Sequence, residues 1–518
     1  MEYIITTESR KVLCPVEGQK IQMVIDCDMI VPDIKPDMDY IVDCKGQAVI
    51  TDENVFDGRI SFKGRMDICV IYYSAVDGGR ICSMKSIQPF EDFINADDAS
   101  SGDYVLLTPV LEHIEYKAIN GRKLAVKAIL SVMAHIENMR EITIPSKCNE
   151  ENGLFVNIDQ KKIKETTGII NTSFKMQEEI SMPVSKDSIE NIISCDAYVF
   201  SDDLKAIDGG VRAMGKIRIS LMYEGDSGEA IVETESFEVP YDGILDSSGV
   251  REGNIVCGKT YIKNSMANVI TDSEGKGKTL MFDCEVAVKA QALSNSDEYF
   301  VCDAYSDREC INAHTQEVIY PVLTGKNKNK TVVKDTIKSE NADILKYIYS
   351  CGDISYYDVN CLKNTVEING IADISVICLT ESDEKPVMTL ESSIPFSQEA
   401  EITGVDSDNL YCVNVTVEDI QVNVLNSKEI EVSAYIVIDL YTEKMCSQMC
   451  IEKIEKDETA VNDAPSAAIY VVQNDDTLWD IAKRYKTAKE NILALNNLES
   501  EDAIKKGKKL LIVKKVQL

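Results

Sequence analysis

The chain has 518 residues, of which 44% are hydrophobic, and carries a formal net charge of −33. This length favours several domains, and the hydrophobic content is sufficient for folded cores. The negative charge argues against nucleic acid as a partner, because phosphate binding requires clustered Lys and Arg.

The N-terminal segment MEYIITTESRKVL lacks the basic region and following apolar region of a secretory signal peptide. No run of 18 apolar residues is present, so we expect no transmembrane segment. The 17 Cys are scattered along the chain, as in proteins of a reducing compartment, where Cys behaves as a small core residue. These features predict a cytoplasmic protein.

Three glycines, each inside an apolar–polar alternation, mark an internal repeat: Gly64, Gly215 and Gly370. They lie 151 and 155 residues apart. Further landmarks recur in register with them: an upstream Cys, a downstream Pro–aromatic pair, and an apolar residue that opens a new run (Cys44, Cys195, Cys351; Pro89, Pro240, Pro395; Tyr104, Ile255, Leu410). Such repetition predicts three copies of one module.

Each copy has the pattern of half-buried strands. Met66, Ile68, Val70 and Tyr72 alternate with other residues at a period of two, and the repeated glycine suggests a bulge or a close backbone approach. The segments before the repeated Cys, 34–44 and 185–195, are compatible with short helices. We therefore predict a mainly β fold of three repeated modules, and a sandwich and a barrel remain alternatives for each.

Changes in composition suggest the domain limits. Polar, aperiodic or charged stretches are typical of linkers. The predicted division is module 1 at 1–142, a linker at 143–178, module 2 at 179–320, a linker at 321–335, module 3 at 336–451, a linker at 452–468, and a C-terminal domain at 469–514.

The C-terminal domain has the order strand–helix–helix–strand. An apolar strand opens it at 469–472, Thr477 and Asp480 form a predicted capping box, and a second strand follows Gly507. Residues 466–518 hold ten Lys or Arg and seven Asp or Glu, which gives this region a net charge of +3. It is therefore a small α+β domain that differs electrically from the acidic body.

This domain resembles the LysM family in its motifs YVVQ, DTLWDIAKRY, ILALNNL and KKGKKLLI. The resemblance implies binding of N-acetylglucosamine glycans such as peptidoglycan, in a groove between the loops 474–478 and 497–505. The candidate partner-binding or glycan-binding residues are Asn474, Asp475, Asp476, Thr477, Leu478, Trp479, Asn497, Leu498 and Ile504.

Two of these residues decide how the groove is interpreted. The LysM family usually has Gly where this chain has Asp475, and the adjacent acids Asp475 and Asp476 argue against close approach of a sugar. Trp479 is the only Trp; it is either a packing residue of the small core or an exposed binding anchor.

The repeated module resembles the SPOCS family of endospore-forming bacteria, through its Ile-x-x-Cys segment, its Gly-centred strand with a following Tyr, and its Pro–aromatic pair. The resemblance implies a sporulation protein of the mother cell that is recruited to the forespore surface. There it would bind an ATP-hydrolysing coat protein, stage IV sporulation protein A. The expected function is a non-enzymatic scaffold or adaptor for spore coat assembly; the alternative is a peptidoglycan-binding protein.

Sites for catalysis, metals or cofactors are not predicted. The three His form no metal-binding motif, and GKT at 277–279 lacks the first Gly of a phosphate-binding loop, because Asp272 occupies that position. GDSG at 225–228 falls in a predicted hairpin tip. We therefore expect no enzymatic activity, and the sequence leaves the oligomeric state open.

Overall fold

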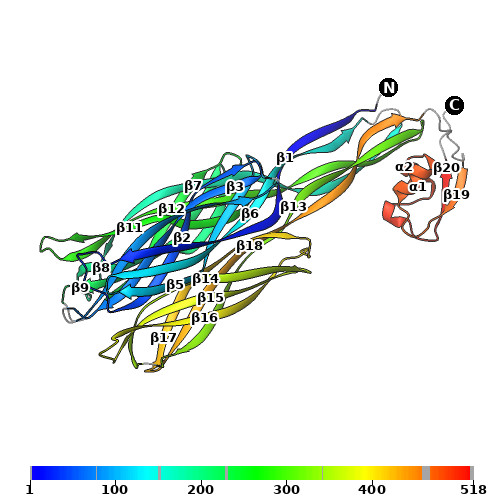
Figure 1. Cartoon of the computed structure of the whole chain (residues 1–518). Helices are drawn as coiled ribbons and strands as arrows, with labels where there is room; N and C mark the ends of the chain where they lie inside the picture. The colour runs from blue at the N-terminus through cyan, green and yellow to red at the C-terminus, as the bar shows by residue number, and fades with distance from the viewer. Residues whose placement is uncertain are drawn as a thin grey trace.

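The computed structural model describes residues 3–76, 79–97, 99–149, 153–227, 232–340, 342–457 and 467–513. β-Strands dominate, as predicted, and they form an elongated body with a narrow extension at one end (Figure 1). Among the described residues, none of the helices has the length and apolarity needed to span a membrane.

The first block has six strands in two antiparallel sheets, ordered β2-β3-β4 and β1-β6-β5. One core lies between them, with Phe62 and Met66 from one sheet and Leu124 and Leu130 from the other. Of the two predicted alternatives, the block is therefore a sandwich. Its strands are β1 (Ile5–Ile30), β2 (Tyr40–Phe56), β3 (Arg59–Ser74), β4 (Arg80–Asn95), β5 (Tyr104–Asn120) and β6 (Lys123–Cys148).

The second and third blocks repeat this arrangement, each with its own core. The second consists of β7 (Leu154–Ser181), β8 (Ile189–Ile207), β9 (Gly210–Gly225), β10 (Glu233–Asp246), β11 (Ile255–Thr271) and β12 (Gly277–Ser306). The third consists of β13 (Ile311–Lys338), β14 (Ile344–Leu362), β15 (Thr365–Thr380), β16 (Val387–Glu401), β17 (Leu410–Asn426) and β18 (Glu429–Lys456). The predicted triplication is confirmed.

The repeated glycine and the Pro–aromatic pair are explained by strand register. Each glycine lies directly opposite the aromatic residue of the next strand: Gly64 opposite Phe90, Gly215 opposite Tyr241, and Gly370 opposite Phe396. A Cβ atom at Gly64 would lie 2.2 Å from Cζ of Phe90, so the ring occupies the space that a side chain would need. The constant spacing between the repeated glycine and the Pro–aromatic pair thus results from a cross-strand contact between the glycine and the aromatic ring.

Segments predicted as linkers or helices are strands in the structure. Residues 143–148 belong to β6, 154–178 to β7, and 321–335 to β13. These strands have one face open to solvent along much of their length, which gives them the polar composition that we took for linkers. Of the predicted linker 452–468, residues 452–456 end β18, and 458–466 lie outside the described residues.

The two segments predicted as short helices, 34–44 and 185–195, are turns followed by strands in the structure. A turn at 33–35 is followed by β2, which carries Cys44, and β8 carries Cys195. Residues 40–44 and 189–195 of these segments are paired in the sheets with β3 and β9, so the strand pairing of the fold overrides a weak local helical pattern.

The three blocks surround a common axis, because equivalent residues from each meet in shared clusters. Val42, Ile193 and Ile348, spaced 151 and 155 residues apart, pack in one cluster. Leu106, Cys257 and Cys412, which have the same spacing, pack in another. The blocks are thus related by an approximate threefold axis.

The narrow extension, which we call the stalk, consists of one two-stranded ribbon from each block. The paired residues are 5–16 with 136–148, 154–164 with 295–306, and 311–322 with 444–456. Apolar residues from all three ribbons pack together inside it, among them Ile144, Phe300 and Tyr320. Figure 1 shows the C-terminal domain at the tip of the stalk.

The C-terminal domain has the predicted strand–helix–helix–strand order. Its elements are β19 (Ala467–Val471), α1 (Leu478–Tyr485), α2 (Lys489–Leu495), a 3₁₀ turn (Glu501–Ala503) and β20 (Lys509–Val513), with β19 antiparallel to β20. The Thr477 side chain accepts a hydrogen bond from the backbone N–H of Asp480, and the Asp480 carboxylate accepts one from that of Thr477. This capping box satisfies two N–H groups that the first turn of a helix leaves unpaired.

Candidate functional site

The first loop of the predicted groove, 474–478, turns through a left-handed residue. Asp475 has φ +65°, a conformation that Gly adopts freely and that Asp tolerates better than most residues. Both Asn474 and Asp475 are exposed. The replacement of the usual Gly by Asp475 thus preserves the path of the loop and adds a solvent-facing carboxylate.

The neighbouring acid has a different role. One carboxylate oxygen of Asp476 accepts hydrogen bonds from the Tyr470 hydroxyl at 2.6 Å and from the backbone N–H of Gln473 at 2.7 Å. These bonds lower the pKa of Asp476, with the Tyr470 contact the larger cause. Asp476 therefore fastens the loop to β19, and Asp475 is the exposed acid of the pair.

The second loop contributes one exposed residue and two core residues. Asn497 is exposed at φ +49°, and Leu498 and Ile504 are half-buried against the core of the domain. Leu478 is buried in the same core, and Thr477 caps α1. The predicted set therefore divides into exposed loop residues (Asn474, Asp475, Asn497) and residues that support the fold (Asp476, Thr477, Leu478, Leu498, Ile504).

Trp479 packs against the stalk. Only 9% of its surface is exposed, and its ring meets that of Tyr305 edge-on at 4.9 Å between centroids. Its Nε1 donates a hydrogen bond to Asp303 at 2.8 Å, and Lys483 forms an ion pair with the same carboxylate at 2.6 Å. Of the two interpretations of Trp479, the structure supports packing, and the partner surface is the end of β12.

The contact between the C-terminal domain and the stalk extends beyond Trp479. The Tyr305 hydroxyl donates to the backbone O of Thr487 at 2.9 Å, and Phe155 stacks on Tyr305 at 5.0 Å. These residues could not be found from local sequence patterns, because the whole third block lies between Tyr305 and Trp479 in the chain. An aromatic residue close to an acid on one strand, such as Tyr305 and Asp303, is also common in sheets that contact no other domain, so this pattern alone does not indicate a docking surface.

We expect Asp303→Ala to expose Trp479, because the substitution removes both the acceptor of its indole N–H and the partner of Lys483. The fluorescence emission of this single Trp should move to longer wavelength, and acrylamide should quench it more strongly. Asp297→Ala, at an exposed position on the same strand, is the matched control. An unchanged spectrum for Asp303→Ala would contradict the described docking.

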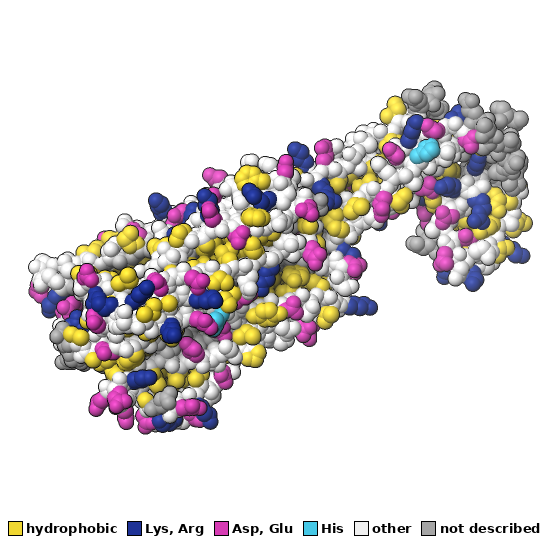
Figure 2. Space-filling view, viewed as in Figure 1, with side chains coloured by type: hydrophobic (Ala, Val, Ile, Leu, Met, Phe, Trp, Pro, Cys, Tyr) yellow, Lys and Arg dark blue, Asp and Glu magenta, His cyan; other side chains and the backbone are white. Residues whose placement is uncertain are grey.

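The outer face of the β19–β20 sheet is exposed and mainly apolar, and Lys509, opposite Val471, is its charged residue. Ile469 and Leu511 lie directly opposite each other with 71% and 43% of their surfaces exposed, and Val471 lies on the same face. The alternate residues Leu510 and Ile512 are buried against the helices. Figure 2 shows hydrophobic side chains at the outer edge of this domain, where Figure 1 places β19. This face was not predicted, although the unbroken apolar runs 469–472 and 510–513 imply that both faces of the two-stranded sheet carry apolar side chains.

A second group of polar residues lies on the approximate threefold axis, where the body meets the stalk. Lys164, Glu137 and Glu443 are fully buried, and the Lys164 ammonium donates to Glu137 at 2.6 Å and also to Glu443. Gln291 and Tyr441 donate to the other oxygen of Glu137 at 2.6 and 3.0 Å. We call these residues, together with His135, the axial cluster.

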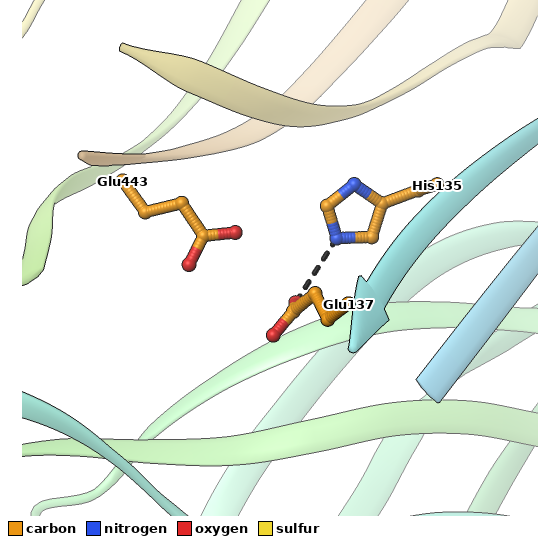
Figure 3. A group of neighbouring side chains, drawn as sticks. All are labelled: His135, Glu137 and Glu443. Atoms are coloured by element: carbon orange, nitrogen blue, oxygen red, sulfur yellow. Dashed lines mark hydrogen bonds and ion pairs between the residues drawn. The ribbon is translucent and has the colours of Figure 1, made fainter. Parts of the chain in front are cut away.

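Figure 3 shows how the axial cluster is assembled. His135 and Glu137 project from the same strand, with Nε2 of His135 3.0 Å from Glu137, and Glu443 reaches toward them from β18. Three potential metal ligands thus lie close together. The Lys164 ammonium bridges the two carboxylates, so a side chain supplies the positive charge that a cation would supply.

The pKa values of the two carboxyl groups of the axial cluster are shifted in opposite directions. Burial opposes ionisation of Glu137, but the Lys164 charge and the contacts with His135 and Lys164 outweigh it and lower the pKa of Glu137 to about 2. Burial and the Glu137 charge raise the pKa of Glu443 to about 7. Among the described residues, Oε1 of Glu443 has no hydrogen-bond partner, which also disfavours its ionised form.

Comparison with known families identifies both kinds of domain. A family described as SipL, SPOCS domain, matches residues 37–119, 188–270 and 343–425. The LysM domain family matches residues 470–513. The SPOCS matches cover the region from β2 to β5 and its two equivalents, so the stalk lies outside them. No curated protein and no solved structure matches the chain.

Proposed function

Because the chain carries three SipL-type SPOCS domains followed by one LysM domain, we propose that it is a non-enzymatic scaffold for spore coat assembly. In this proposal the LysM domain binds a coat morphogenetic ATPase that resembles stage IV sporulation protein A. The observation that carries the proposal is the exposed apolar face of Ile469, Val471 and Leu511 on a small, positively charged domain at the tip of the stalk.

Such a face is better suited to a protein than to a sugar. Exposed apolar patches on small domains are typical of protein-binding surfaces, whereas a glycan requires polar groups arranged around a groove. Trp479 is buried against the stalk, so it is not available as a binding anchor in this arrangement. The face on β19 and β20 lies opposite the side that packs on the helices, and it stays exposed while α1, which carries Trp479, is docked on the stalk.

Peptidoglycan is the second candidate partner, and one observation favours it. Asp475 and Asn497 both hold left-handed conformations, so each groove loop keeps a tight turn. A glycan that contacts backbone groups in these loops would tolerate the Asp475 side chain, because that side chain is exposed to solvent.

Binding measurements with the full-length protein distinguish the two candidates. The probes are a purified stage IV sporulation protein A-like ATPase, in surface plasmon resonance, and peptidoglycan sacculi, in co-sedimentation. Ile469→Glu should weaken ATPase binding by about thirtyfold, as expected for loss of an interface hot spot. Ile319→Glu, at a similarly exposed apolar position on the stalk, should leave it unchanged.

The outcomes favour one candidate or the other. Saturable sedimentation with sacculi, together with absence of ATPase binding, would replace the adaptor by the glycan-binding alternative. Equal ATPase binding by both variants would place the contact elsewhere on the chain.

The proposed site of action is the mother-cell cytoplasm at the forespore surface. The SPOCS matches support a role in sporulation. A fluorescent fusion should therefore form a shell around the forespore, and the Ile469→Glu variant should remain dispersed in the mother cell. A wild-type fusion that stays dispersed through sporulation would contradict this placement.

A further inference from the structure

The stalk brings together two thiols from different blocks. Cys302 is half-buried at a bulge in β12, where the pairing with β7 shifts between Val301 and Asp303. Cys450 is buried on β18, and both residues belong to the apolar cluster inside the stalk. The bulge turns Cys302 out of the regular alternation of its strand and toward the third block.

Gln448 contacts both thiols and fixes their relative positions. Its side-chain amide donates a hydrogen bond to Sγ of Cys302 at 3.2 Å, and its backbone O accepts one from Sγ of Cys450 at 3.4 Å. Tyr320 packs in the same cluster, and its ring stacks at a tilt against Phe300 at 5.3 Å. The two sulfur atoms are thus confined between β12 and β18.

The two thiols differ in acidity. Hydrogen bonding between them lowers the pKa of Cys302, against the effect of burial, and raises that of Cys450. Thiolates are the reactive form of Cys, and partial exposure admits a small oxidant. The more acidic thiol is also the more exposed one, which is the arrangement of an attacking Cys beside a resolving Cys.

We propose that Cys302 and Cys450 form a redox-active pair that hydrogen peroxide converts to a disulfide between the second and third blocks. The Cys302 thiolate attacks the peroxide O–O bond, which forms a sulfenic acid and releases one water after proton transfer. The Cys450 sulfur then attacks the sulfenic sulfur; the S–S bond forms, the S–O bond breaks, and a second water leaves. Two thiols are oxidised by two electrons in total, and a dithiol reductant reverses the reaction.

Peptide mapping of the oxidised full-length protein tests this proposal. The protein is treated with stoichiometric hydrogen peroxide, alkylated, digested with trypsin without reduction, and analysed by mass spectrometry. Cleavage after Lys289, Arg308, Lys444 and Lys453 places Cys302 alone in peptide 290–308 and places Cys450 in peptide 445–453. We expect a linked pair of these peptides, and we expect dithiothreitol to separate it.

Peptide 445–453 also contains Cys446, so variants are needed to assign the link. Cys446→Ser is the matched control and should retain the linked peptides, whereas Cys450→Ser and Cys302→Ser should lose them. Cys450→Ser should instead accumulate a sulfenic acid on Cys302, detected with dimedone. Loss of the link in Cys446→Ser, or wild-type protein whose Cys302 stays reduced while other Cys react, would overturn the proposal.

Discussion

Lys164→Met should lower the free energy of unfolding by about 3–5 kcal/mol, because it leaves the buried Glu137 carboxylate without its counterion. Lys164 is fully buried and forms ion pairs with both Glu137 and Glu443. Burial of an uncompensated carboxylate is costly, and the methionine side chain fills the same space without supplying charge or hydrogen-bond donors. Urea denaturation followed by circular dichroism at pH 7.5 measures the loss.

The control is Lys162→Met, an exposed position on the same strand, for which a change within about 0.5 kcal/mol is expected. Because all three blocks meet at the axial cluster, the transition of Lys164→Met should stay cooperative while its midpoint falls. A stability equal to that of wild type would show that the axial carboxyl groups are neutral or hydrated in the folded protein.

The free energy of unfolding of Glu443→Gln should increase relative to that of wild type as the pH rises from 5 to 8. The folded state holds the pKa of Glu443 at about 7, above its usual value of 4.5. Between these values the unfolded chain releases the proton and the folded chain retains it, so the stability contributed by Glu443 is complete below pH 4.5 and is lost as the pH rises through 7. The amide of the variant cannot ionise and avoids this loss.

Between pH 5 and pH 8, the free energy of unfolding of Glu443→Gln minus that of wild type should rise by an amount on the order of 2 kcal/mol. The depressed pKa of Glu137 acts below pH 4.5 and therefore does not enter this window. Paired urea titrations at the two pH values provide the measurement, with Glu367→Gln, on β15, as control. A pH-independent difference would show that Glu443 is ionised throughout.

Local patterns were sufficient to predict the repeated strands and the order of the C-terminal domain. The alternation around Gly64 reflects strands that bury one face, and the spacing to Phe90 reflects a cross-strand contact, so both are recorded in nearby residues. The capping box at Thr477 is likewise a local feature. The linkers were mispredicted for the same reason: β7 and β13 are polar on their solvent-facing side, and composition alone does not distinguish such a strand from a loop.

Contacts between distant segments could not be predicted. Trp479 meets Tyr305 only because β12 continues into the stalk, and Lys164 meets Glu137 and Glu443 only because three blocks converge on one axis. Nothing in the immediate sequence of Lys164 distinguishes it from the neighbouring surface lysines. Positions in the groove could be assigned from the LysM resemblance, but the division into exposed and supporting residues depends on side-chain directions in the folded domain.

The approximate threefold axis gives this chain the geometry of a trimer whose subunits are covalently joined. Identical subunits would place the same residue three times at the axis, whereas here the positions opposite Tyr104, Ile255 and Leu410 hold Glu137, Leu293 and Glu443. A single lysine can therefore compensate two acids, an arrangement that exact symmetry forbids. Fusion also makes the association of the blocks independent of protein concentration, so dilution cannot separate them as it would a homotrimer.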